Sequence, residues 1–331
     1  MGRRFGKAGE FTGVVRQAVG ARVVAAVRLR GGSQKGVYRV TLDDGGSVVV
    51  YVWSAEENYW AGDGGSAGNA ASHVDGIGYF ETAHRRLSAA GVRVPRLHLA
   101  DRSRARYPAD VAVLEDVPGE SLEGLMARDP ARARGVLGRL GDALRLMALD
   151  RGPGRYGRPA DLASVTAPQP PCEQGVLASA LRDVDEAAAR EPRAARGREL
   201  LRDAVRELAG RVRPRTEYGL VHGELGPDHV LVDGAGTPVL IDFEDLRYFD
   251  VEREHAFLHI RFHEEARGLR VPGLDEDRLD FYLLAHRISL VAGPLRLLEG
   301  DFPHRDAMRG IAEHNLTEAL RHGRRIFAAR R

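Results

Sequence analysis

Lysine is nearly absent from this 331-residue chain, which contains only Lys7 and Lys35 among its 49 lysine and arginine residues. Cys172 is the single cysteine, so no disulfide can form within the chain, as is usual in a reducing cytosol. No run of about 18 apolar residues could span a bilayer, and the basic, polar segment 1–10 lacks the apolar core of a signal peptide. These absences predict a cytoplasmic protein without a membrane partner, in which any role that needs a lysine has few candidates.

A strong excess of charge of either sign is also missing. The formal net charge is +2 at pH 7, with 29% charged and 43% apolar residues, which is ordinary for a folded globular protein. A nearly neutral chain has no overall field that would demand a polyanion, so we expect no nucleic-acid partner. The length favours about two domains.

The N-terminal region has the pattern of a sheet. Five segments are rich in β-branched residues or alternate between apolar and polar positions, as strands do: 22–30, 37–42, 47–53, 92–100 and 111–114. A glycine-rich loop separates the first two, and an Asp-Gly turn separates the next two. Apolar residues at helical spacing predict a helix over 77–90, preceded by a glycine- and alanine-rich segment, 61–76, that we expect to be a mobile loop. The pattern predicts a five-stranded antiparallel sheet with one helix.

The rest of the chain is predicted to be mostly helical, after a break at 115–119 that has the composition of a hinge. We therefore expect an N-terminal lobe, 1–116, and a C-terminal lobe, 117–331. The later elements follow in this order: a helix with the apolar stripe Val136, Leu140, Leu144 and Met147, a proline- and glycine-rich loop over 150–172, two helices within 174–211, short apolar stretches over 218–222, 230–233 and 238–243, and a helical tail.

The most informative segment begins with His222-Gly223-Glu224 and ends with Asp242, twenty positions after His222. A short strand leads into a polar loop that holds Glu224, a hairpin of two apolar strands follows, and the second strand leads to Asp242. Such a hairpin brings both loops to one end, so the two carboxylates should face one space. This arrangement suits phosphoryl transfer, in which one carboxylate orients the attacking hydroxyl and another holds the metal on the nucleotide phosphates.

This segment resembles the catalytic loop of the aminoglycoside phosphotransferase and choline-kinase-like family, which reads His-Gly-Asp, four residues, Asn, a hairpin, and Ile-Asp-Phe or Ile-Asp-Trp. Here it reads His222-Gly223-Glu224, four residues, His229, and later Ile241-Asp242-Phe243. The resemblance implies an α+β, protein-kinase-like fold of two lobes, with a nucleotide-binding N-terminal lobe and a catalytic, substrate-binding C-terminal lobe. It also implies that ATP or GTP, with Mg²⁺, phosphorylates a hydroxyl of a small molecule such as an aminoglycoside-like antibiotic, an amino alcohol or a sugar.

The resemblance places the nucleotide between the lobes, with its base against the backbone of Glu115 and Val117. Taken alone, the glycine loop would equally suit an ordinary hairpin turn. Between two strands and ahead of the catalytic-loop pattern, it favours phosphate binding through close approach of the backbone. The loop residues expected to contact the nucleotide are Gly31, Gly32, Ser33, Lys35 and Gly36.

The catalytic roles follow from the same resemblance. Asp242 would hold Mg²⁺, although an aspartate there could also merely cap a turn. Glu224 would orient the acceptor hydroxyl and take its proton. His222 is expected to be structural, and Glu254 is expected to brace the catalytic loop in place of the family's aspartate.

Three positions depart from the family pattern. Glu224 replaces the catalytic aspartate and carries the same carboxylate on a longer arm. His229 replaces a metal-binding asparagine, and imidazole is a poor ligand for Mg²⁺; it could contact phosphate, a metal could be lost, or it could be a surface residue. Tyr51 replaces the phosphate-binding lysine of the third strand, which leaves its usual helix partner, Glu81, without a lysine. Lys35 could supply the missing charge from the glycine loop.

These departures leave a second class of function open, a pseudokinase-like protein that binds a nucleotide or small ligand without catalysis. The altered positions 51, 224 and 229 favour this reading. The intact Asp242, and the polar character of every replacement, favour an enzyme.

Overall fold

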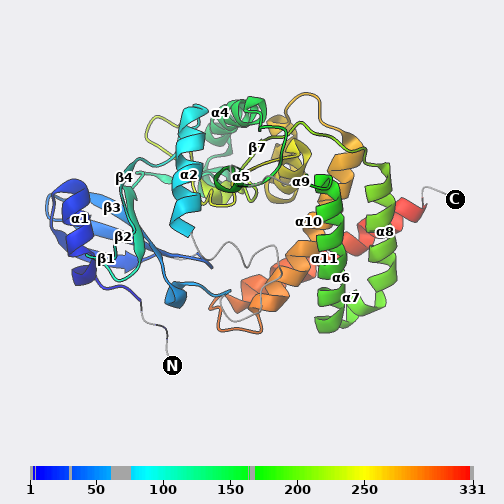
Figure 1. Ribbon diagram of the computed structural model, residues 1–331, viewed down its shortest axis with the longest axis horizontal. Coiled ribbons are helices and arrows are strands. Elements are labelled where there is room, and N and C mark those ends of the chain that lie inside the picture. The colour runs from blue at the N-terminus through cyan, green and yellow to red at the C-terminus, as the bar shows by residue number, and fades with distance from the viewer. Residues whose placement is uncertain are drawn as a thin grey trace.

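The computed structural model describes residues 3, 5–29, 32–60, 76–162, 164 and 168–328 (Figure 1). Gly31 and, apart from Gly76, the segment predicted to be a mobile loop lie outside the described residues. A small N-terminal lobe built on a sheet lies beside a larger, mostly helical C-terminal lobe, so the predicted fold class is confirmed.

The N-terminal lobe contains the predicted five-stranded antiparallel sheet, with strand order β1-β2-β3-β5-β4. Its strands are β1 Val23–Arg28, β2 Gly36–Leu42, β3 Ser47–Trp53, β4 Leu97–Asp101 and β5 Asp110–Glu115. The predicted strand over 92–100 is wrong for residues 92–96, which precede β4. Pro95 has no N–H group to give to a strand ladder. The Arg93 carbonyl instead accepts a hydrogen bond of 2.9 Å from the Leu240 N–H group of the other lobe.

Helices cover both faces of this sheet (Figure 1). One face packs against η1 Ala8–Phe11 and α1 Thr12–Val19, where Phe11 and Val14 join valines of β2, β3 and β5 in a core. The other face packs against α2 Gly76–Ala89, the predicted helix, through the buried Phe80 and Leu87. Tyr51, on β3, faces this second side and therefore lies between the sheet, α2 and the C-terminal lobe.

The C-terminal lobe arranges helices around two small sheets. One sheet has the order β6-β8-β9, with β6 Glu120–Ser121, β8 Val230–Val232 and β9 Pro238–Leu240; the other pairs β7 Gly219–Val221 with β10 Arg247–Phe249. The helices are α3 Leu122–Arg128, α4 Pro130–Leu149, α5 Pro159–Leu162, α6 Cys172–Arg190, α7 Pro192–Arg196, α8 Arg198–Arg211, η4 Pro227–His229, α9 Val251–Phe262, η5 His263–Leu269, α10 Glu276–Leu297 and α11 Arg305–Ala328. None of the described helices is both long and apolar enough to cross a membrane.

The helical predictions hold in outline and fail in detail. The predicted apolar stripe of α4 is buried along its whole length. The region predicted to hold two helices, 174–211, instead has three, because Pro192 begins the short α7. A proline fits the first turn of a helix and breaks a helix interior, so α6 could not continue through this position. The short α5 also lies inside the predicted loop over 150–172.

Several contacts join the lobes, and two of them lie far from each other along the chain. Phe80 of α2 stacks on Phe243, which follows β9, with ring centroids 5.3 Å apart. The N-terminal segment reaches the loop between α10 and α11, where Arg3 forms a 2.7 Å ion pair with Asp301. The predicted lobe boundary at residue 116 falls between β5 and β6, in the connection that links the two sheets.

Candidate active site

A cavity of about 730 Å³ is lined by residues of both lobes. The N-terminal lobe contributes Lys35 from the loop before β2. The C-terminal lobe contributes four carboxylates, Glu224, Asp242, Glu244 and Asp245. The predicted glycine-loop lysine and both predicted carboxylates of the catalytic segment therefore share one space.

The β8–β9 hairpin brings the two carboxylate-bearing loops together, as its sequence predicts. Glu224 follows β7, and Asp242 comes two residues after the end of β9. The Ile241 N–H group donates a 3.0 Å hydrogen bond to the His229 carbonyl, which ties the two loops to each other. Asp242 has a φ of 61°, in the left-handed region that is uncommon for residues other than glycine. Backbone strain of this kind concentrates at functional sites.

Lys35 is the centre of the charged cluster. Its Nζ lies 2.5 Å from Oδ1 of Asp242 and 2.6 Å from Oε1 of Glu244, and the whole residue is only 5% exposed. Burial opposes the charged form, but the two carboxylates raise the pKa of Lys35 above its ordinary value. Burial likewise opposes ionisation of Asp242, yet Lys35 and then His229 hold the pKa of Asp242 well below its usual range. Both groups are therefore ionised at neutral pH.

Glu244 is buried more deeply than Asp242, with its side chain 18% exposed against 39%. Burial raises the pKa of Glu244, Lys35 opposes that rise, and the neighbouring Asp242 adds to it. Glu244 directly follows the Ile-Asp-Phe pattern, and its acidic character is the only signal in the sequence that could have indicated its contact with Lys35.

Tyr51 takes the place in β3 at which the resemblance implies a lysine. Its ring centroid lies 4.9 Å from Nζ of Lys35, in a cation–π contact. The ring also packs edge-on against Trp53 and Phe80. Burial raises the pKa of the Tyr51 hydroxyl, so the side chain is neutral at pH 7. The ammonium group of Lys35 therefore lies directly beside the position of the missing lysine.

Glu81 is not part of this cluster, and its partner is an arginine instead of a lysine. Its carboxylate forms an ion pair with Arg102, which follows β4. Successive residues of a helix are rotated by about 100°. Because Phe80 faces the interior, Glu81 lies on a more exposed side of α2.

His229 connects the loop that carries Glu224 to Asp242. Its Nδ1 lies 2.8 Å from the Glu224 carbonyl oxygen, and its Nε2 lies 3.4 Å from Oδ2 of Asp242. Its ring stacks on that of His222, with centroids 6.2 Å apart. The His229 ring is thus engaged on both edges and borders the cavity.

His222 lies fully buried behind the loop that carries Glu224. Its Nε2–H donates a 2.9 Å hydrogen bond to the Ile241 carbonyl. Burial, followed by the proximity of His229, lowers the pKa of His222 to about 4. A ring that is neutral and enclosed at pH 7 ties the loop after β7 to the residue that follows β9.

Glu254 of α9 contacts the loop that carries Glu224. Its Oε2 accepts a 2.8 Å hydrogen bond from the Gly223 N–H group. Burial raises the pKa of Glu254 to about 7, although the backbone hydrogen bonds of the loop oppose the rise. Gly223 has a φ of 99°, and a Cβ atom there would lie 2.9 Å from the Asp245 carboxylate, so the loop needs glycine at this position.

Glu224 projects from this loop and is exposed toward the cavity. Desolvation inside the cavity, and then the carboxylates of Asp245 and Asp242, raise the pKa of Glu224. Asp245 differs because it pairs with Arg158 at 3.0 Å and with Arg247. Burial opposes its ionisation, but these arginines lower the pKa of Asp245. Of these two carboxylates of the cavity, Glu224 therefore has a raised pKa and Asp245 has a lowered pKa. Neither Asp245 nor Arg158 is indicated by the sequence pattern.

The glycine loop and the hinge are shaped by contacts within the protein. Gly32 has a φ of 69°, and the Ser33 hydroxyl accepts a 2.9 Å hydrogen bond from Nε1 of Trp60. A Cβ atom at Gly36 would meet the Glu57 carboxylate at 2.5 Å. The two predicted hinge residues are not among the described residues that line the cavity. Glu115 forms an ion pair of 2.6 Å with Arg93, and Val117 is buried.

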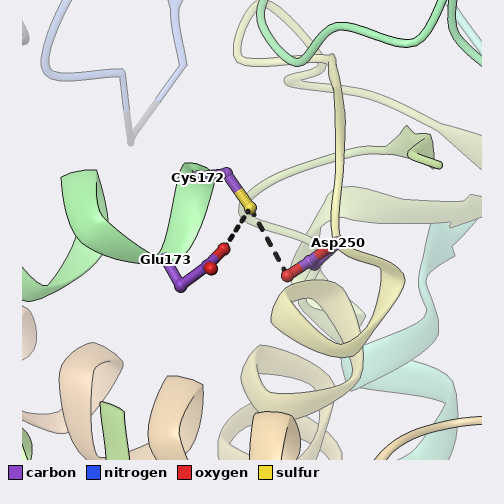
Figure 2. Close-up of side chains that lie close together, drawn as sticks. All are labelled: Cys172, Glu173 and Asp250. Carbon is purple, nitrogen blue, oxygen red and sulfur yellow. Dashed lines mark hydrogen bonds between the residues drawn. The ribbon is translucent and has the colours of Figure 1, made fainter. Parts of the chain in front are cut away.

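A separate buried cluster joins Cys172, Glu173 and Asp250 (Figure 2). The Cys172 Sγ lies 3.6 Å from Oε2 of Glu173 and 3.4 Å from Oδ2 of Asp250. A metal would need a thiolate, but burial and then Asp250 raise the pKa of the Cys172 thiol. Asp250 is also already paired with the buried Arg278 and accepts a hydrogen bond from the Tyr282 hydroxyl. These contacts make the cluster part of a buried polar network of the core.

Comparison with known proteins places this architecture. The model of the Phosphotransferase enzyme family matches residues 26–290. No curated protein matches the chain by sequence. Among solved structures, the chain is similar to the spectinomycin phosphotransferase APH(9)-Ia in complex with ADP and spectinomycin, with 14% identity and a TM-score of 0.64 over 97% of this chain and 99% of that one.

Two other structures give the same result. A GDP and kanamycin complex of APH(2")-IIia has 17% identity and a TM-score of 0.62, covering 96% of this chain and 99% of that one. The apo form of a thermostable mutant of the aminoglycoside phosphotransferase APH(4)-Ia has 16% identity and a TM-score of 0.59, covering 90% and 95%. At these identities the likeness shows the fold, which is the kinase-like fold. The family match extends over most of the chain and includes the residues of the charged cluster, so the chain belongs to the phosphotransferase enzyme family.

Proposed function

We propose that this protein is a nucleotide-dependent O-phosphotransferase that uses ATP or GTP to phosphorylate a hydroxyl of a small molecule. The observation that carries the proposal is the convergence of Lys35, Asp242 and Glu224 on one cavity of about 730 Å³ between the lobes. A lysine, a metal-binding carboxylate and an acid–base carboxylate are the parts that phosphoryl transfer needs.

The proposed roles follow from the chemistry of each group. Lys35 and the backbone of the glycine loop, including Ser33, would bind the phosphates of a nucleotide whose base lies near the connection at Glu115 and Val117. Glu224 would orient the acceptor hydroxyl and take its proton. Its raised pKa suits this role, because a general base works best when its pKa approaches the operating pH.

The donor groups of the cavity fit Mg²⁺. Carboxylate oxygens are its preferred protein ligands, and Asp242 and Asp245 supply them here. Asp242 would hold the ion, and His229 would orient Asp242 through its Nε2 contact. When bound, the ion would neutralise the developing charge on the phosphates. Catalysis by the chain itself would come from positioning and fixed charges.

The acceptor is proposed to be an aminoglycoside-like antibiotic, an amino alcohol or a sugar. Two of the similar solved structures contain spectinomycin or kanamycin together with a nucleoside diphosphate, which supports a small hydroxylated acceptor. We further propose that residues 1–116 form the nucleotide-binding lobe, that residues 117–331 form the catalytic and acceptor-binding lobe, and that the protein acts in the cytoplasm.

A binding protein without catalysis is the second candidate. His229 favours it, because its ring occupies the position of the family's metal-binding asparagine and supplies no oxygen ligand. A screen of purified protein with ATP, GTP and Mg²⁺ against a panel of antibiotics, amino alcohols and sugars tests both. A mass increase of one phosphoryl group on an acceptor establishes the transferase. Metal-dependent nucleotide binding without any mass change favours the binding protein. If neither the mass change nor nucleotide binding is observed, both candidates are refuted.

A further inference from the structure

Lys35 is a buried lysine that forms ion pairs with two carboxylates. The Nζ of Lys35 contacts Asp242 and Glu244 at nearly equal distances, 2.5 and 2.6 Å. An ammonium group has three hydrogen-bond donors, so it can serve both acceptors and still direct a third donor elsewhere. Lys35 comes from the N-terminal lobe and both acceptors come from the loop after β9, so the cluster also joins the two lobes.

The two carboxylates are not equivalent for a working site. Asp242 is the more exposed of the two and, on the proposed function, would hold Mg²⁺. Lys35 must then release Asp242 while remaining in place to meet the phosphates. Glu244 is the carboxylate that stays available to hold it, since Glu244 is less exposed and lies on the buried side of the same loop. Glu81 of α2 is engaged with Arg102 and does not contact Lys35.

We propose that Glu244 is the positioning residue for Lys35, so that the lysine–acid pair of this site is built between the glycine loop and the loop after β9. In this pair, Lys35 of the β1–β2 loop takes the place of the family's β3 lysine. Glu244 takes the place of the family's helix glutamate. Tyr51 completes the arrangement, because its ring lies under the ammonium group and excludes water from that side. The inference rests on the proposed function for the ligand of Lys35, whereas the pair itself is a property of the free protein.

The near absence of lysine makes the pair directly measurable. An amine-specific acylating reagent can modify only Lys7, Lys35 and the terminal amine, and peptide mass spectrometry separates the three. Lys7 is exposed and serves as an internal standard, whereas Lys35 is buried. In Glu244→Gln, the Lys35 to Lys7 rate ratio should rise by about tenfold, the shift in an opening equilibrium expected from the loss of about 1.4 kcal/mol of ion pairing. Glu244→Asp should keep the ratio close to that of the wild type.

A matched control comes from the helix acid. Glu81→Gln removes the same charge from a carboxylate that contacts Arg102, and it should leave the Lys35 ratio unchanged. If Glu244→Gln leaves the ratio unchanged, or if Glu81→Gln raises it as much, the inference is overturned. The melting temperature of each variant shows whether the substitution destabilises the whole protein. General unfolding would raise the reactivity of Lys35 in Glu81→Gln and Glu244→Gln alike, whereas local release of Lys35 raises it in Glu244→Gln alone.

A kinetic readout then connects the pair to nucleotide. On an identified acceptor, Glu244→Gln should raise the KM for the Mg²⁺–nucleotide complex about tenfold, with a smaller fall in kcat and with recovery in Glu244→Asp. A fall in kcat alone would overturn the positioning role. The labelling experiment uses no nucleotide, so it tests the Lys35–Glu244 pair even in a protein that transfers no phosphate. If labelling is unchanged in Glu244→Gln and the wild type is an active phosphotransferase, the Lys35–Glu244 pair is refuted and the proposed function is not.

Discussion

Replacing Lys35 with methionine should have two opposite effects on ligand binding. The first concerns metal. Asp242 and Glu244 both lie within 2.6 Å of the same nitrogen, so their contacting oxygens are at most about 5 Å apart. Two like charges at about 5 Å repel by about 3 kcal/mol at an effective dielectric constant near 20. Because Asp242 is 39% exposed, solvent screening should reduce this to about 1–2 kcal/mol. A divalent cation relieves that repulsion, so Lys35→Met should bind Mg²⁺ or Mn²⁺ alone more tightly by roughly tenfold.

The second effect concerns phosphate. If Lys35 contacts the phosphates, its removal takes away at least one hydrogen bond to a charged group, worth about 1.5–3 kcal/mol. At saturating Mg²⁺, the affinity for nucleoside triphosphate should therefore fall by about 10- to 100-fold. The affinity for the nucleoside, which has no phosphate, should change little. The variant thus separates the metal carboxylates from the phosphate-binding cation.

Isothermal titration with Mn²⁺ alone, with nucleoside, and with nucleoside triphosphate at saturating Mg²⁺ measures all three quantities. Lys7→Met is the matched control, because it removes the same charge from the only other lysine, which is exposed. It should leave every affinity within about twofold of the wild type, since a single exposed charge contributes little. Equal losses for nucleoside and triphosphate in Lys35→Met, or a weaker metal affinity, would refute the reasoning.

Four further predictions follow from the remaining contacts. Asp242→Asn should abolish the Mg²⁺ dependence of nucleotide binding while the fold persists, and titration at two Mg²⁺ concentrations would contradict this if the dependence remains. Glu224→Gln should lower kcat by roughly 10²- to 10⁴-fold with nearly unchanged nucleotide affinity, and turnover near that of the wild type would exclude Glu224 as the base. The pKa of Glu254 is raised by burial to about 7 from 4.5, so its stabilising contribution is present below about pH 4.5 and is lost as pH rises through 7. The free energy of unfolding of the wild type relative to Glu254→Gln should fall by about 3 kcal/mol across that window, whereas a difference independent of pH in urea unfolding would contradict it. Arg278→Met should lower the free energy of unfolding by about 3–5 kcal/mol, because it leaves the fully buried Asp250 without its arginine; a loss below about 1 kcal/mol in urea unfolding would show that the pair is not needed.

Most strands of the N-terminal lobe could be predicted because their signal is local. Valine-rich alternation and an Asp-Gly turn identify β2 and β3, and the helical spacing of Phe80 and Leu87 identifies α2. The two-residue and one-turn elements could not be predicted in this way. β6 pairs only two residues with β8, and its position depends on a partner more than one hundred residues away. The α1 helix is short, and its burial against the sheet rather than its local pattern makes it stable.

In the candidate site too, the features set by nearby residues could be predicted and the long-range contacts could not. The spacing of His222, Glu224 and Asp242 predicts a shared space, because a hairpin of fixed length joins the loops that carry them. The partners of Lys35 were beyond such reasoning, since its contact with Asp242 spans 207 positions. The sequence by itself determined the family pattern, the strands and the two carboxylate loops, because these depend on neighbours within a few residues. Only the tertiary structure decided that Lys35 pairs with Glu244 and that Glu81 turns to Arg102, because the packing of the lobes and the rotation of α2 set which charges meet.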